Sequence, residues 1–267
     1  MTDRSATDRR RFLARTAAIV GTLALGGCTD LSQQPWVVGI LGEVEKLTRR
    51  AQRLFAGGHA LAPEYAKADV APTFRANGTL NPNTNDYNVH VAGGFKDWLI
   101  DVGGLVEKPL QLSLAQLRAM PARTQITRHD CVEGWSCIGE WTGTPLRLVL
   151  AMTKPKAEAR YVVFHCADPM GEATMDANGN VVQPPFYYES LDLLEATHPQ
   201  TILAYELNGG NLPVAHGAPV RLRAGRQLGY KMPKYVQRIE LVSSFARIQG
   251  GKGGYWEDQG YQWYGGI

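Results

Sequence analysis

The sequence feature that most restricts the fold is a strand, a tight turn and a helix start packed into residues 121–150. β-branched residues recur over Thr124–Thr127 after the breaker Pro121, which predicts a short strand. Cys131 is therefore expected where this strand ends and a turn containing Gly134 begins. Residues 144–145 are Thr-Pro, a cap followed by proline at the first helical position, and they predict a helix.

Cys131 has unusual neighbours in the sequence. It lies in Arg128-His129-Asp130-Cys131-Val132-Glu133-Gly134-Trp135-Ser136. A lone cysteine is most often a small buried hydrophobe, but titratable groups so near it are costly to bury in a core. The pattern therefore favours a thiol that faces a cavity on a rigid support.

A second group of residues combines glycine, proline and cations. It comprises His216-Gly217-Ala218-Pro219-Val220-Arg221 and then Gly229-Tyr230-Lys231-Met232-Pro233-Lys234. Glycine and proline shape a backbone whose amides can approach a ligand, and arginine offers two donors in a fixed fork. These residues together can offer several charge-assisted donors to one ligand, although each charge alone could be a solvated surface residue.

Both groups, with Trp141-Thr142-Gly143-Thr144-Pro145-Leu146, resemble the sulfite oxidase family of molybdopterin enzymes. Within that family they look most like the periplasmic methionine-sulfoxide reductase catalytic subunits. The resemblance covers about residues 70–245. It implies molybdenum and molybdopterin as cofactors and Cys131 as the protein ligand to the metal, for which a soft thiolate is suited.

The resemblance also implies further site residues. Arg221 and Lys234 are expected at the cofactor phosphate, with Lys231 nearby and His216 at the pterin. Thr73-Phe74-Arg75-Ala76-Asn77 resembles a family segment at the mouth of the cofactor pocket, although an ordinary loop is the alternative. Cys166 falls where the related reductase has a threonine that contacts the cofactor, and a core cysteine is equally expected there. These residues are Phe74, Arg75, Asn77, Cys166, His216, Arg221, Lys231 and Lys234.

The residues after Cys131 bear on the substrate. Classical sulfite oxidases have a basic run there, whereas Glu133 and Trp135 follow here. A carboxylate opposes an incoming dianion, so these two catalytic candidates favour a neutral oxygen donor or acceptor such as a sulfoxide. The implied reaction is two-electron oxygen-atom transfer. Without a flavin or nicotinamide motif, a separate cytochrome or quinone-linked membrane protein is expected to exchange the electrons.

Two other classes stay open at this stage. One is a structural zinc site built from His129, Cys131, Cys137 and either Cys166 or His165, although the spacing fits no tetrahedral pattern. The other is a cofactor-binding or assembly protein that keeps the fold without turnover. Nucleic-acid binding is not expected, because residues 1–27 hold five arginines against two aspartates and the rest has 23 basic and 23 acidic residues.

The amino-terminal residues predict export. Arg9-Arg10 before Phe12-Leu13 and a short apolar run match a twin-arginine signal, and Leu25-Gly26-Gly27-Cys28 resembles a lipobox that would tether the protein to a membrane. We therefore expect a periplasmic or cell-envelope enzyme.

Three segments follow from these patterns. Residues 1–28 form the signal, residues 29–62 an amphipathic extension and residues 63–267 one molybdopterin-binding domain. Because strands and short helices mix without a βαβ rhythm, the expected class is α+β with the sulfite oxidase-type molybdopterin-binding fold.

Overall fold

The computed structural model describes residues 34–55 and 60–267. The predicted signal and lipobox, and the glycine pair expected to end the extension, lie outside these residues. Residue contacts divide the chain into two units after Arg53. Helix α3 (Pro35–Phe55), which belongs to the first unit up to Arg53, lies within the predicted extension. No helix of the described ranges is long and apolar enough to cross a membrane.

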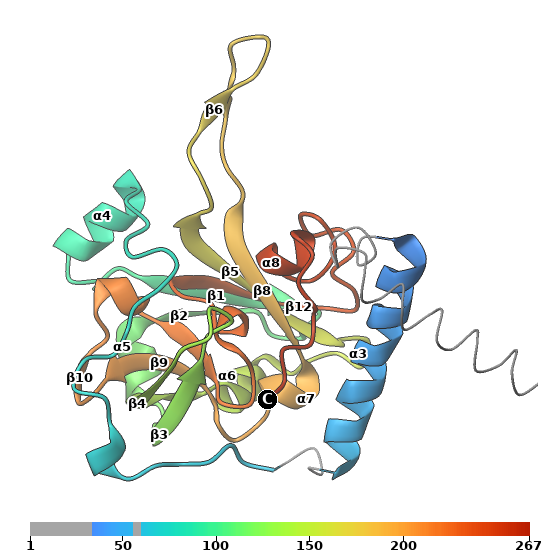
Figure 1. The fold of residues 1–267 in the computed structure, drawn as a ribbon. Helices are drawn as coiled ribbons and strands as arrows, with labels where there is room; N and C mark the ends of the chain where they lie inside the picture. Colours follow the sequence, from blue (N-terminus) through green and yellow to red (C-terminus); the bar gives the residue numbers. More distant parts are fainter. Residues whose placement is uncertain (1–33, 56–59) are drawn as a thin grey trace, which may run out of the picture. The chain divides into compact units, whose positions relative to one another are not determined.

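The second unit is built on two five-stranded sheets (Figure 1). In the first sheet the order is β2 (Leu110–Ser113), β1 (Leu99–Gly104), β12 (Val236–Val242), β5 (Tyr161–Pro169) and β8 (Phe186–Asp192). In the second the order is β10 (Gly210–Asn211), β9 (Thr201–Leu207), β4 (Ser136–Pro145) and β3 (Arg123–Asp130), and β11 (Arg221–Ala224) also pairs with β9. Among these described strands only β1 and β12 pair in parallel.

Short helices connect and cover the sheets. They are α4 (Asn85–Ala92), α5 (Leu114–Ala119), α6 (Leu146–Thr153), α7 (Leu193–Ala196) and α8 (Tyr255–Asp258), with 3-10 turns η1 (Lys67–Asp69), η2 (Val214–His216) and η3 (Gly229–Lys231). Helix α5 begins with the capping box that its sequence predicts, in which Ser113 accepts from the Gln116 amide. Mixed sheets with few short helices confirm the α+β class.

The main core lies between the two sheets. It takes Ile100, Phe164 and Ile239 from the first sheet, and Leu203 and Leu222 from the second. Ile202 and Ala204 alternate with Leu203 along β9 and belong to a smaller cluster with Phe74 and Trp141 on the opposite face. Strand β9 is therefore buried on both sides, which fixes the position of β4 and of the turn that follows β3.

The structure differs from local sequence patterns in three places. Helix α6 begins at Leu146, one residue after the proline expected inside it, because Pro145 still belongs to β4. Ser190 before Leu191 to Ala196 has the pattern of a helix cap, but α7 begins only at Leu193 with Asp192 as its cap, since Ser190 is buried in β8 and donates to the Gly253 carbonyl. Residues 176–185 are rich in Gly, Asn and Pro, which predicts a loop, but they belong to a hairpin that contains β6 (Thr174–Met175) and β7 (Val181–Val182).

Candidate functional site

Cys131 lies at the strand-to-turn junction that the sequence predicts. Strands β3 and β4 form a hairpin in register up to Asp130 opposite Ser136. The five-residue turn between them closes when the Cys131 amide donates to the Trp135 carbonyl at 2.9 Å and the Gly134 amide donates to the Cys131 carbonyl at 3.1 Å. Gly134 has a φ of 84°, which glycine adopts at least cost. A strand pair therefore holds the thiol in place.

The sulfur of Cys131 is surrounded by hydrogen-bond donors. Asn77 Nδ2 donates to Cys131 Sγ at 3.1 Å, and the backbone amides of Glu133 and Val132 also favour its charged form. Burial dominates, however, and raises the pKa of the thiol above its ordinary value. The site is thus shaped for a thiolate that a bound cation would stabilise.

Two cations, the buried Arg221 and the partly buried Lys234, lie in the same pocket. Arg221 at the start of β11 donates to the carbonyls of His216 at 3.1 Å and Met232 at 3.0 Å. Lys234 Nζ donates to the carbonyl of Asn77 at 2.9 Å, and also to the carbonyls of Thr79 and Ala215. Asn77 therefore links the cation pair to Cys131. Burial, and then Arg221, lower the pKa of Lys234 to about 7, and burial lowers the pKa of Arg221 to about 10.

Gly217 makes this approach of the two cations possible. Its φ is 108°, a conformation that a side chain would strain. A Cβ at this position would also lie 2.8 Å from the Cβ of Lys234 and 3.1 Å from that of Arg221. The glycine in the His-Gly-Ala-Pro-Val-Arg segment is therefore required by the packing of the two cations.

The pocket has unmet polar groups that fit an anionic cofactor with hydrogen-bond donors. No carboxylate within 60–267 forms an ion pair with Arg221 or Lys234, and Arg221 Nε has no hydrogen-bond partner in that range. Asp168 is 3% exposed, and its Oδ1 has no partner there either. Because a buried unpaired cation is costly, an anion such as a phosphate monoester would stabilise this pair.

Arg223 is a buried residue that the sequence analysis did not select. Its side chain is fully buried on β11, where Nη1 lies 2.7 Å from His129 Nδ1 and Nη2 lies 3.2 Å from Thr127 Oγ1. Burial, and then Arg223, hold the pKa of His129 well below its ordinary value. His129 is therefore neutral, with Nδ1 as an acceptor. The alternation of β11 could have indicated Arg223, since Arg221 and Arg223 lie two residues apart on one strand face.

Of the predicted residues Glu133, Trp135 and Arg75, only Glu133 lines the pocket, and the other two lie against its carboxylate. Trp135 Nε1 donates to Glu133 Oε2 at 2.9 Å, and Arg75 Nη2 is 4.0 Å from the same oxygen. The Arg75 guanidinium is also 4.8 Å from the centre of the Trp135 ring. Arg75 thus offsets part of the Glu133 charge, so this carboxylate repels an anion less than the sequence alone indicates.

Four further predicted residues do not line the cavity either. Phe74 and His216 pack edge to face with ring centres 5.7 Å apart, and Cys166 lies fully buried in β5. Lys231 is buried and forms ion pairs with Glu189 and Glu257. Burial acts to lower the pKa of Lys231, but the two carboxylates outweigh it and raise the pKa.

The cavity itself has a volume of about 180 Å³. Its walls include Cys131, Asn77, Glu133, Asp168, Arg221 and Lys234, together with the apolar or aromatic side chains of Val132, Met170, Tyr187, Tyr230, Met232, Trp256 and Tyr261. A few convergent polar groups in an apolar lining are typical of a ligand site.

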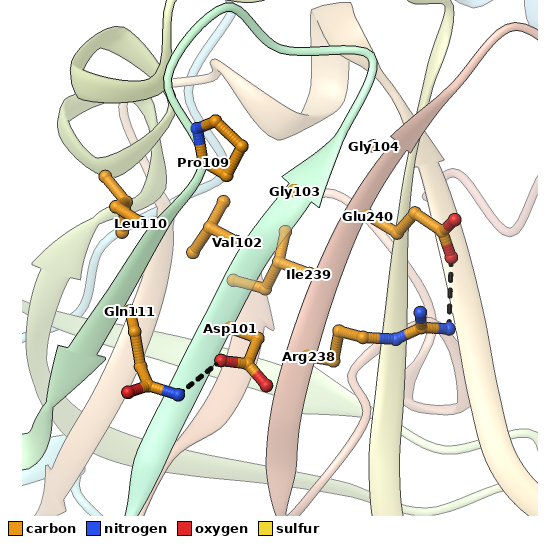
Figure 2. Close-up of a pocket in the computed structure, with 10 residues that line it drawn as sticks. All are labelled: Asp101, Val102, Gly103, Gly104, Pro109, Leu110, Gln111, Arg238, Ile239 and Glu240. Carbon is orange, nitrogen blue, oxygen red and sulfur yellow. Dashed lines mark hydrogen bonds and ion pairs between the residues drawn. The ribbon is translucent and has the colours of Figure 1, made fainter.

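A second depression lies over β1, β2 and β12 (Figure 2). Its polar side chains satisfy one another: Gln111 donates to Asp101 at 2.7 Å, and Arg238 pairs with Glu240 at 3.1 Å. It contains neither a thiol nor an unpaired cation among its lining residues. The cavity at Cys131 is therefore the stronger candidate.

The described residues do not support the zinc alternative. Within residues 34–55 and 60–267, no three His, Cys, Asp or Glu side chains gather as a metal site would require. His129 is turned to Arg223, and the three described cysteines are all free. This leaves Cys131 alone among the candidate ligands of that set to face the cavity.

The fold and this cavity define a class of protein. Residues 87–247 match the family described as the oxidoreductase molybdopterin binding domain. The chain belongs to this family, and it is a molybdopterin-dependent oxidoreductase of the sulfite oxidase type, with molybdenum and molybdopterin as its cofactors. The sequence-based predictions of family, fold, enzyme class and cofactor are thus confirmed.

Three individual relatives show which members of the family this chain is similar to. The chain is 35% identical over 260 residues to a putative protein-methionine-sulfoxide reductase subunit, YedZ1, of Azospira oryzae, which covers 97% of this chain and 87% of the relative. It is 31% identical over 246 residues to the protein-methionine-sulfoxide reductase catalytic subunit MsrP of Xanthomonas axonopodis pv. citri, covering 91% and 72% of the two chains. The MsrP subunit of Campylobacter jejuni is 36% identical over 148 residues, or 55% and 50%.

Proposed function

We propose that this enzyme reduces a sulfoxide at the Cys131 cavity by two-electron oxygen-atom transfer. The observation that carries the proposal is the Cys131 sulfur, held on a strand turn in a cavity that is also lined by two cations without a carboxylate partner within 60–267. Three relatives, at 31–36% identity, have names that specify protein methionine sulfoxide as their substrate.

Different residues would hold the phosphate and the metal of the cofactor. Arg221 and Lys234 would bind its phosphate, since both line the cavity and lack a carboxylate partner within 60–267. Cys131 would ligate the metal with Asn77 fixing the orientation of its sulfur. The cofactor would supply a metal centre able to carry out two-electron oxygen-atom transfer.

The other lining residues suit a neutral, partly apolar substrate. Met170, Tyr187 and Trp256 offer apolar surface to the carbon substituents of a sulfoxide. Reduction of a sulfoxide to a sulfide consumes two electrons and two protons and releases water. Asp168 lines the cavity and burial raises its pKa to about 6, so it can hold a proton at Oδ1.

Glu133 and Trp135 would act at the substrate side of the metal. Glu133 lines the cavity, and it accepts a hydrogen bond from Trp135 and lies 4.0 Å from Arg75. With Arg75 present the local charge is close to balanced, which suits a neutral sulfoxide better than a sulfite dianion.

The electron donor and the location belong to the same proposal. Two relatives are named as catalytic subunits, so a separate redox protein would supply the electrons. The twin-arginine pattern at Arg9-Arg10 would direct export to the cell envelope, and Cys28 would be the site of a lipid tether. Replacing both arginines by lysine and fractionating cells tests the export route, and fatty-acid labelling with Cys28→Ala tests the tether.

The decisive experiment compares the cysteines in cofactor-loaded protein. Cys131→Ser should abolish reduction of methionine sulfoxide by a reduced viologen dye while much of the pterin stays bound, because the phosphate contacts lie elsewhere. Cys137→Ser and Cys166→Ser are the matched controls and should stay active. X-ray absorption at the molybdenum edge should show one sulfur ligand fewer in Cys131→Ser. An unchanged sulfur count, or efficient sulfite oxidation by the parent enzyme, would contradict the proposal.

A further inference from the structure

A hairpin outside the main sheets is not used by the function proposed above. Residues 171–185, here called the arm, leave the end of β5 and return into β8, and they contain β6 and β7. In Figure 1 the arm extends well beyond the two sheets of the second unit. Strands β6 and β7 pair only with each other within the described residues, so each has one open edge.

Hydrogen bonds at the tip and at the base hold the arm in a defined conformation. At its tip, Asp176 Oδ1 accepts hydrogen bonds from the amides of Asn178 and Asn180 at 2.8 Å each, and Asn180 Nδ2 donates to Asp176 Oδ2 at 2.9 Å. At its base the Met170 amide donates to the Pro185 carbonyl at 2.8 Å. A turn closed from its own side chains and a paired base hold the two strands in register.

The arm exposes apolar side chains on both faces. Met175 lies opposite Val181 in the pairing, and Val182 lies opposite Thr174. Met175 is 77% exposed, Val181 59% and Val182 47%. A two-stranded ribbon is only marginally stable in water by itself, and exposed apolar residues on it indicate a surface that another molecule covers.

The arm is continuous with the rim of the Cys131 cavity. Met170, directly before the arm, and Tyr187, two residues after it, both line that cavity. Phe186, between the arm and Tyr187, is 40% exposed. A molecule that lies along the arm therefore has one end beside the opening that leads to Cys131.

The charge of the arm and its open strand edges indicate what kind of molecule would bind to it. The arm has two acidic residues, Glu172 and Asp176, and no basic residue, so it does not attract an anionic lipid surface. Its open strand edges present unpaired backbone N–H and C=O groups, which an extended polypeptide can pair with while its side chains contact the exposed Met and Val.

We propose that the arm is the docking surface for the polypeptide that carries the sulfoxide. An extended segment of the substrate protein pairs with an edge of the arm and packs on Met175, Val181 and Val182, and its methionine sulfoxide then enters the cavity past Met170. This inference rests on the proposed function for the identity of the group delivered. The arm contacts themselves are independent of turnover.

The test uses the full cofactor-loaded chain and a fluorescent peptide with a central methionine sulfoxide. The arm variant is Met175→Ser/Val181→Ser/Val182→Ser. We expect its affinity for the peptide, measured by fluorescence anisotropy, to fall by about 10-fold or more, and its kcat/KM for the peptide to fall by the same factor. With dimethyl sulfoxide as substrate and reduced viologen as donor, kcat/KM should stay at the parent value. The matched control is Leu61→Ser/Met152→Ser, which changes residues exposed by 56% and 49% away from the arm and should behave like the parent.

Four outcomes are distinguishable. Unchanged peptide affinity in the arm variant would overturn the proposal. A parallel loss with both substrates would also overturn it, because the cavity itself would have changed. A loss seen only when a protein donor replaces the viologen would assign the arm to the redox partner and refute a substrate role. If the parent reduces neither substrate but still binds the peptide through the arm, the docking surface stands and the proposed reaction fails.

Discussion

The pKa of Lys234 makes the stability of the cofactor-free protein depend on pH. Its folded pKa is about 7, mainly because of burial and next because of Arg221, against an ordinary value of 10.5. Between these values the unfolded chain binds one more proton than the folded chain, so stability rises with pH. From pH 7 to 8.5 the gain should be about 1.5–2 kcal/mol, because each pKa unit is worth 1.36 kcal/mol and the folded group is still half protonated at pH 7.

The assay is urea unfolding of cofactor-free protein at pH 7 and 8.5. The window ends there because burial raises the pKa of the Cys131 and Cys166 thiols, which would reduce stability at higher pH. Lys234→Met should remove the dependence on pH and stabilise the protein at pH 7, whereas Lys156→Met, at an exposed lysine, should keep it. Equal pH dependence in the parent and Lys234→Met would refute the reasoning. In loaded protein the phosphate should cancel the effect.

Three further predictions concern the same region. Arg221→Met should lower molybdenum and pterin content without unfolding the chain, because each charge-assisted hydrogen bond that it removes is worth about 1.5–3 kcal/mol. Arg147→Met, at an exposed arginine, is the control. Full cofactor content in Arg221→Met would contradict the assignment of Arg221 to the cofactor phosphate. Gly217→Ala should destabilise the protein by about 1–3 kcal/mol in urea, and more than Gly179→Ala, which shares a positive φ but meets no atom within 4 Å. Burial, and then Arg221 and Lys234, lower the pKa of His216 to about 4, so cofactor-free protein should lose about 1–2 kcal/mol of stability as the pH falls from 6.5 to 4, after allowance for solvent screening of its partly exposed ring; His216→Asn should lose less.

Local sequence determined the elements that carry the site. The Ser113 capping box opens α5, and Asn208-Gly209, with φ values of 52° and 81°, forms the tight turn between β9 and β10. The strand and turn at Cys131 likewise formed as predicted. These features depend on residues within one turn or one strand, so their physical causes are present in the sequence itself.

Other features of the site depend on contacts between distant parts of the chain. Asn77 reaches Cys131 across 54 residues, and Arg223 reaches His129 across 94. No local pattern specifies such pairs, because pairing of the sheets brings them together. The burial that shifts the pKa of Lys234 and His129 is likewise a property of the packed molecule.

The pairing of the arm strands and the ion pairs of Lys231 are two features that the local sequence does not determine. Residues 176–185 have the composition of a loop, yet β6 and β7 pair because the long strands β5 and β8 bring their ends together. Lys231 and Lys234 are both lysines of one short segment, but Glu189 and Glu257 surround the first and the cavity opens to the second. Sequence by itself determined the kinds of side chain available for the chemistry and their order along the chain. Only the tertiary structure decided which of the described cations have no carboxylate partner, since that depends on which carboxylates the fold brings near.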